Sequence, residues 1–171
     1  RGGWQANSKY IMFIHQDVDL SSESWLEDAE KTLDSLPNLG IAGVAGKKDN
    51  KGIITNIKHG NPPVSAGAIK LTTSTKVQTL DECLVIIPKD VFDLIKFDET
   101  VCNDWHLYAV DYCLSIKHLG FDAYVLPIPV YHRSAAYSLS ESYYITLENV
   151  LKKHKNYYKM IFTTVGNWST R

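Results

Sequence analysis

The sequence lacks any apolar run approaching the roughly 20 residues that a membrane-spanning helix needs, so we expect no transmembrane segment. It also lacks a surplus of either charge, because its 18 Lys and Arg residues nearly balance its 19 Asp and Glu residues. Nucleic-acid binding normally requires a basic surplus or a basic stripe, and we therefore expect no nucleic acid among the partners. A P-loop, a nucleophile elbow and an HExxH helix are all absent, which argues against the common phosphoryl-transfer and hydrolase sites.

Cysteine is scarce and is not spaced for a structural role. The three residues, Cys83, Cys102 and Cys113, are odd in number and contain no CxxC pair. This spacing indicates neither a disulfide framework nor a zinc-binding site, and unpaired thiols are the default in a reducing compartment. We therefore expect a cytoplasmic chain.

The composition is that of an ordinary globular domain, with 44% hydrophobic and 22% charged residues. The length of 171 residues fits a single domain spanning residues 1–171. Apolar runs predict strands at 10–15, 41–46, 82–87 and 123–126, with weaker strand candidates such as 52–58 in a polar stretch over 47–80. Helical spacing predicts helices at 22–36, 89–95 and 104–119, and a helical tail over 139–171. This alternation predicts a layered α/β domain with a mixed central sheet.

The first predicted strand leads directly into two carboxylates. Asp17 and Asp19 follow the apolar run 10–14 and are separated by one residue. Alternate residues of an extended chain point the same way, and ligands of open α/β sheets bind outside the carboxyl ends of the strands. Both carboxylates can therefore converge on one target, and such hard oxygen ligands suit Mg²⁺ or Mn²⁺. The alternative is that Asp19 only precedes or caps the helix predicted from residue 22.

A second candidate stretch lies in the helix predicted over 104–119. Asp104 and Asp111 are seven residues apart, so two helical turns would place them on one face. A carboxylate on such a face can act as a general base for a substrate hydroxyl. The structural alternatives are an N-cap for Asp104 and pairing with a cation for Asp111. His106 fits either a substrate contact or a partly buried packing position.

A third stretch places His132 and Arg133 at the end of a proline-containing extended segment. Imidazole completes many transition-metal sites, and the Arg133 guanidinium is suited to a phosphate. A lone histidine of this kind is more often structural. His132 gains weight because Asp17, Asp19 and His132 all follow predicted strands, whose ends can meet in a parallel arrangement.

Together the three stretches resemble a glycosyltransferase of the A-type fold, close to family 2 and to its subgroup with a Phe-x-His-Gln-Asp-Val signature. The matching segments are residues 13–19 (FIHQDVD), 105–111 (WHLYAVD) and 130–134 (VYHRS). The resemblance covers nearly all of this chain but only the later part of the family domain, so we expect a domain truncated at its N-terminus. It also implies a departure, because Ala109 stands where many members of the family carry an acidic residue.

The resemblance implies a metal-dependent, inverting transfer of a sugar from a nucleotide-sugar donor to a hydroxyl of a glycan or another acceptor, in the synthesis of a surface glycan. The ion would be Mn²⁺ or Mg²⁺, with the ligands Asp17, Asp19 and His132. The residues expected to contact the donor are His15, Gln16, Asp17 and Arg133. The candidates for the catalytic base are Asp111, Asp104 and His106. A non-catalytic nucleotide- or sugar-binding module is the alternative, and assembly into a homo-oligomer is left open.

Overall fold

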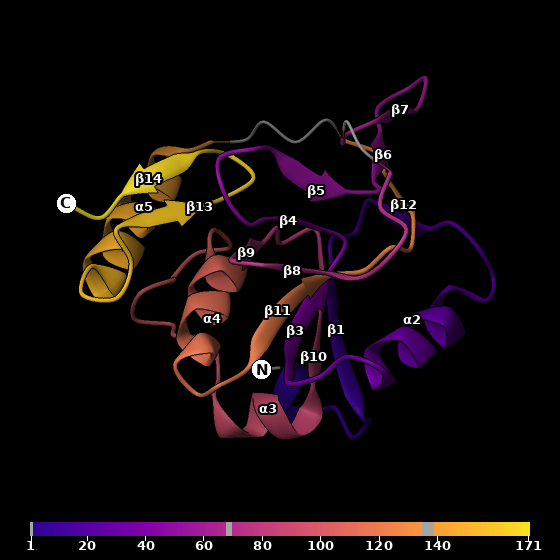
Figure 1. Cartoon of the computed structure of the whole chain (residues 1–171), viewed down its shortest axis with the longest axis horizontal. Helices are drawn as coiled ribbons and strands as arrows, with labels where there is room; N and C mark the ends of the chain where they lie inside the picture. Colours follow the sequence, from indigo (N-terminus) through magenta and orange to yellow (C-terminus); the bar gives the residue numbers. More distant parts are fainter. Residues whose placement is uncertain (1, 68–69, 135–138) are drawn as a thin grey trace.

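The computed structural model describes residues 2–67, 70–134 and 139–171, and its centre is a five-stranded sheet (Figure 1). In spatial order the strands are β1 (Tyr10–Ile14), β10 (Leu84–Pro88), β3 (Leu39–Gly43), β11 (Asp122–Val125) and β8 (Thr75–Val77). β10 is antiparallel to both β1 and β3, whereas β3 and β11 are parallel. The predicted mixed sheet is therefore confirmed. β1, β3 and β11 run in the same direction and end at the same edge of the sheet.

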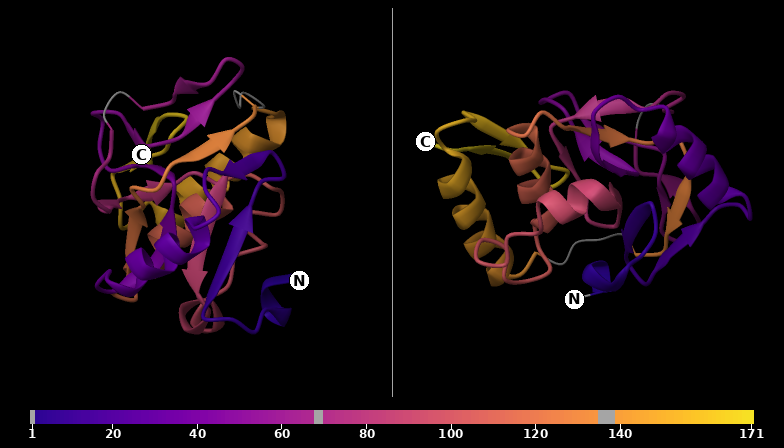
Figure 2. Two further views of the ribbon diagram at one scale, coloured as in Figure 1. Left: turned by 90° about the vertical axis from the view of Figure 1, so that its right-hand side faces the viewer. Right: turned by 90° about the horizontal axis from the view of Figure 1, so that it is seen from below.

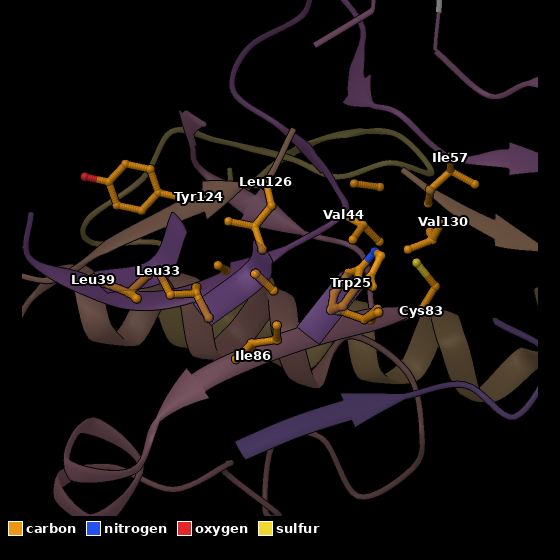
Figure 3. Packing of buried hydrophobic residues seen from close by; sticks show 14 residues of the cluster. Trp25, Leu33, Leu39, Val44, Ile57, Cys83, Ile86, Tyr124, Leu126 and Val130 are labelled. Carbon is orange, nitrogen blue, oxygen red and sulfur yellow. The ribbon is translucent and has the colours of Figure 1, made fainter. Parts of the chain in front are cut away.

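One face of the central sheet is covered by α2 (Trp25–Asp34), which confirms the predicted helix within shorter bounds. Its buried residues Trp25, Ala29 and Leu33 recur every four positions, the spacing of one helical face. Figure 3 shows Trp25 close to Val44 and Ile86, in the same hydrophobic cluster. Trp25 is 1% exposed, and a buried aromatic side chain of this size contributes about 3–5 kcal/mol relative to alanine. This packing fixes α2 against the sheet.

The other face is covered by α3 (Lys89–Leu94) and α4 (Tyr108–Lys117). Cys113 and Ile116 of α4 pack in one cluster with Ile41 and Val125 of the sheet. The outer side of α4 is also buried, because Val110 belongs to a further cluster that α4 forms with α5 (Glu141–His154). α4 thus lies between the sheet and α5, while α2 and α5 lie at opposite ends of the molecule (Figures 1 and 2).

α4 begins four residues later than predicted. The residue before it, Leu107, has a φ of 62°. A right-handed helix cannot continue through this left-handed conformation, so α4 cannot begin before Leu107. Leu107 is only 2% exposed, and its packing in the α4–α5 cluster holds this conformation. Asp104 therefore lies in the turn preceding α4. The expectation that Asp104 and Asp111 share one face of a helix is wrong.

A second, smaller sheet lies beyond the edge at which β1 ends. Its strands, in spatial order, are β2 (Val18–Leu20), β12 (Val130–His132), β6 (Lys58–His59) and β7 (Val64–Ser65). β2 follows β1 after a turn over 15–17, and β12 follows β11. Because β2 and β12 pair antiparallel, His132 lies opposite Val18 and Tyr131 lies opposite Asp19.

The polar stretch over 47–80 contains short strands held by local pairing and by one amide side chain. β5 (Ile53–Thr55), β4 (Ala45–Lys47) and β9 (Thr79–Leu80) form a three-stranded sheet. The Asn56 side chain donates to the carbonyl oxygens of Leu71 and Pro127, at 2.7 and 2.9 Å, and accepts from the Leu71 amide at 2.7 Å. Asn56 therefore ties this stretch to the segment that leads into β12.

The C-terminal part differs from the predicted helical tail over 139–171. Helix α5 ends at His154, and β13 (Met160–Phe162) and β14 (Asn167–Ser169) then form an antiparallel hairpin. Ile161 is completely buried in the α4–α5 cluster, and the Trp168 indole donates to the Thr163 hydroxyl at 3.1 Å. Packing on α4 therefore favours an extended conformation here. At the other end of the chain, α1 (Gly2–Gln5) is a single helical turn. Within the described residues, none of the helices has the length and apolar character needed to cross a membrane.

Candidate functional site

A tight turn at the end of β1 presents two of the predicted site residues. The His15 amide donates to the carbonyl oxygen of Cys83 at 2.9 Å, which extends the β1–β10 pairing by one residue. The Val18 amide then donates to the His15 carbonyl oxygen at 3.2 Å and closes a turn over 15–18. The chain therefore reverses its local direction between His15 and Asp17 and does not continue as an extended strand.

β12 brings His132 to this turn. The Arg133 amide donates to the Asp17 carbonyl oxygen at 3.0 Å, and Nε2 of His132 lies 3.2 Å from Oδ1 of Asp17. The rings of His15 and His132 have centroids 5.9 Å apart. One side-chain ligand atom from each of His15, Asp17 and His132 lies within 4.8 Å of the other two. We call these three residues the His-Asp-His cluster.

The cluster is partly shielded from water and carries one carboxylate. His132 is 7% exposed, while His15 and Asp17 are half-buried. Burial raises the pKa of Asp17, but a hydrogen bond from the Ser134 hydroxyl, the nearby His132 and backbone hydrogen bonds together hold the pKa below its usual value. Asp17 is therefore ionised at neutral pH. One carboxylate and two imidazoles at this spacing can bind a divalent transition-metal ion.

Asp19 lies outside the His-Asp-His cluster. Its side chain leaves β2 on the exposed side and forms an ion pair with Arg133, whose Nη2 lies 3.2 Å from Oδ2. The turn at 15–17 explains this placement, since Asp17 and Asp19 do not belong to one continuous strand. Gln16 is exposed in the same turn. Of the predicted metal ligands, the structure brings Asp17 and His132 together, and His15 takes the position that we had expected Asp19 to fill.

Asp104 and His106 lie in the loop before α4. The Asp104 carboxylate accepts a hydrogen bond from the Trp105 amide at 2.7 Å, and a hydrogen bond from Ser142 lowers its pKa. His106 is 6% exposed, and its Nε2 lies 3.0 Å from the Ser140 hydroxyl. Burial lowers the pKa of His106, against the opposing influence of Asp104. Both residues thus join the α4 loop to the start of α5.

Asp111 is buried in α4 and contacts two side chains of α5. It is 2% exposed, and its carboxylate oxygens lie 2.8 Å from Nζ of Lys153 and 2.8 Å from Nε2 of His154. Lys153 also bonds Asp98 at 3.0 Å. This network takes up both oxygens of Asp111, so a substrate hydroxyl has no free access to the carboxylate. The structure assigns Asp111 to the attachment of α5.

A cavity of about 820 Å³ lies elsewhere, along β1 and α3. Its lining includes Phe13, Phe92 and Phe97, and it contains none of the cluster residues. The His-Asp-His cluster instead lies at an open edge of the sheet, near the ends of β1 and β12. Among the described residues, the side chains that could together hold a metal ion converge at this edge and not in the cavity.

The chain matches the model of a known protein family over most of its length. No curated protein matches the chain. The model of a glycosyltransferase-like family matches residues 2–160, a span that contains the His-Asp-His cluster, the loop before α4 and the whole of α5. The layered α/β fold with a mixed sheet is likewise the A-type glycosyltransferase fold that the sequence motifs predicted. With a match over almost its whole length, the chain belongs to this glycosyltransferase-like family.

Proposed function

We propose that this protein is a metal-dependent, inverting glycosyltransferase that moves a sugar from a nucleotide-sugar donor to an acceptor hydroxyl. The observation that carries the proposal is the convergence of His15, Asp17 and His132 at the edge of the sheet, in a chain of the glycosyltransferase-like family. Ligands of α/β sheets bind outside the carboxyl ends of the strands, and both the turn after β1 and the end of β12 lie at such a position.

The donor set of the cluster fits a divalent ion. Two imidazoles and one carboxylate leave coordination positions for substrate oxygens, and imidazole favours a transition ion such as Mn²⁺ over Mg²⁺, which prefers oxygen ligands alone. A bound divalent ion supplies Lewis-acid stabilisation of the charge that develops on a departing diphosphate. His15, Asp17 and His132 would hold it. The low pKa of Asp17 keeps this ligand ionised at neutral pH.

Arg133 adds a second group suited to the donor. Its side chain is 66% exposed beside the cluster, and its backbone amide is fixed to Asp17. A guanidinium binds phosphate oxygens through paired N–H groups. The ion pair with Asp19 holds Arg133 at the mouth of the site until a diphosphate competes for it. Gln16, exposed in the turn, presents an amide to the same region.

A binding module without catalysis is the second candidate. It is favoured by the burial of Asp111 and by its pairing with Lys153 and His154, because these contacts leave the predicted base without access to substrate. Both functions require the His-Asp-His cluster to bind a metal-nucleotide complex. A measurement of sugar transfer distinguishes the two functions, because only the glycosyltransferase turns over the donor.

Calorimetric titration tests the shared requirement. The chain would be titrated with Mn²⁺ alone and then with uridine, guanosine, cytidine and thymidine diphosphates in the presence of Mn²⁺. We expect binding of at least one diphosphate that depends on Mn²⁺, and a loss of more than about 100-fold in Mn²⁺ affinity in His132→Ala, because a direct ligand should matter more than its supporting residues. His118→Ala, which alters an exposed histidine on the far side of α4, is the matched control. Equal Mn²⁺ affinity in the wild type and His132→Ala would refute the metal site.

A further inference from the structure

Glu82 lies at the same edge of the central sheet as the His-Asp-His cluster. Ile14 pairs with Leu84, so the end of β1 and the start of β10 meet there. The carbonyl oxygen of Cys83, the residue between Glu82 and Leu84, accepts the His15 amide hydrogen at 2.9 Å. Glu82 is therefore one residue away from a backbone hydrogen bond to a member of the cluster.

The carboxyl group of Glu82 has an unusual environment. It faces the backbone amides of Ala109 and Val110 in the first turn of α4, and its Oε1 is buried with no hydrogen-bond partner. The residue as a whole remains partly exposed, and it lies at the edge of the sheet. A buried carboxyl oxygen without a hydrogen-bond partner destabilises the folded state, and a native structure rarely tolerates it without a function.

The groups around Glu82 are acidic or neutral. The titratable groups that interact electrostatically with Glu82 are Asp81, Cys83, Cys102, Tyr108, Cys113 and Tyr143. Burial, followed by the negative charge of Asp81, raises the pKa of Glu82 to about 8, against the opposing influence of the helix amides. A carboxylate with a raised pKa is a stronger base than an ordinary one.

We propose that Glu82 is the general base of the sugar transfer, an assignment that rests on the proposed function. The acceptor hydroxyl gives its proton to the Glu82 carboxylate while its oxygen forms a bond to the anomeric carbon of the donor. The bond from that carbon to the diphosphate oxygen breaks, and the electron pair leaves with the nucleoside diphosphate. Attack from the side opposite the leaving group inverts the configuration. The amides of Ala109 and Val110 stabilise the carboxylate before it accepts the proton.

The three base candidates from the sequence are less suitable. Asp111 is enclosed by Lys153 and His154, and Asp104 is held in its own turn by the Trp105 amide. His106 is buried against Ser140. Glu82 instead has a carboxyl oxygen that no side chain or backbone group occupies, and the residue lies, partly exposed, at the sheet edge that holds the cluster. The alternative for Glu82 is a structural role as a cap of α4.

The isosteric variant Glu82→Gln tests the assignment, because glutamine keeps an oxygen that can accept from the helix amides but cannot take up a proton. Release of the free nucleoside diphosphate would be measured for the wild type, Glu82→Gln and the control Glu30→Gln, which alters an exposed position on α2. Each would receive Mn²⁺ and the uridine, guanosine, cytidine and thymidine diphosphate sugars, with water or simple sugars as acceptors. Binding of the matching diphosphate would be measured in parallel.

We expect kcat/KM of the wild type to rise as the pH increases through about 8, since the carboxylate form is the active one. Glu82→Gln should lose about 100-fold or more of kcat and lose this pH dependence, with unchanged affinity for Mn²⁺ and the diphosphate. Wild-type turnover in Glu82→Gln, or a parallel loss of diphosphate binding, would overturn the assignment and leave the proposed transferase intact. Metal-dependent binding without turnover by the wild type would overturn it in favour of the binding module. No binding at all would remove both proposals.

Discussion

Arg133 holds the carboxylate of Asp19 with two nitrogen atoms: Nε lies 3.2 Å from Oδ2, and Nη2 lies 3.2 Å from each oxygen. The two side chains are 66% and 49% exposed. Asp19 therefore acts on the site through a neighbouring cation, while Asp17, two residues earlier in the chain, faces the two histidines directly. This difference makes the two aspartates experimentally separable.

Asp19→Asn should keep the metal affinity of the wild type to within about 3-fold, whereas Asp17→Asn should lose more than about 100-fold. Asp19→Asn should also change the free energy of unfolding by less than about 1 kcal/mol, because an exposed ion pair contributes little. Titration with Mn²⁺ and urea unfolding measure the two effects. An equal loss of Mn²⁺ affinity in both variants would contradict the placement of Asp19 outside the metal site.

Asp111→Asn should act mainly on stability. The substitution removes the buried negative charge that pairs with Lys153 and replaces one of the oxygen atoms that contact Lys153 and His154, and we expect a loss of about 2–4 kcal/mol in the free energy of unfolding. The matched control is Glu27→Gln, at an exposed position of α2. Urea unfolding and turnover would be measured on the same samples below the unfolding transition. Unchanged stability together with complete loss of kcat would contradict the structural role and return Asp111 to the catalytic candidates.

Asp98 should make stability depend on pH in the acid range. A hydrogen bond from Thr100, opposed by burial and reinforced by Lys153, lowers the pKa of Asp98 from 3.8 to about 2. Because the folded-state pKa is depressed, its stabilisation is present above about pH 4 and is lost as the pH falls toward 2. The side chain is 32% exposed, and with solvent screening we expect about 1–2 kcal/mol. In Asp98→Asn, urea unfolding at pH 6 and pH 2.5 should show a correspondingly smaller difference than in the wild type. An identical difference in the two proteins would contradict this.

The repeating elements of the fold were predictable because they depend on local spacing. The apolar run that became β1 and the four-residue spacing of Trp25, Ala29 and Leu33 in α2 are visible in the sequence. The hairpin of β13 and β14 was not predicted, since the extended conformation there depends on the burial of Ile161 against α4. The start of α4 was placed too early because Leu107 adopts a left-handed conformation, and leucine is not a residue type that indicates such a conformation in a sequence.

The sequence identified only part of the candidate site, because the rest depends on tertiary structure. The motif around residues 13–19 identified the segment, and His132 was expected to join it. The turn at 15–17 was missed, although it decides which side chains converge, and the pairing of β2 with β12 depends on residues more than 100 positions apart in the sequence. Glu82 was not singled out, because a glutamate at the first position of a predicted apolar strand looks like an ordinary surface residue. Its unpartnered oxygen and its position beside α4 are properties of the tertiary structure.

The three hydrogen bonds of Asn56 have a further consequence for ligand binding. They hold the backbone of Leu71 in place and also that of Pro127, which lies on the segment that precedes β12 and His132. The conformational entropy of this region is therefore lost during folding, and a ligand that reaches the cluster does not have to order it. Such preorganisation favours fast, rigid recognition of a small charged ligand over a closing movement of this part of the chain.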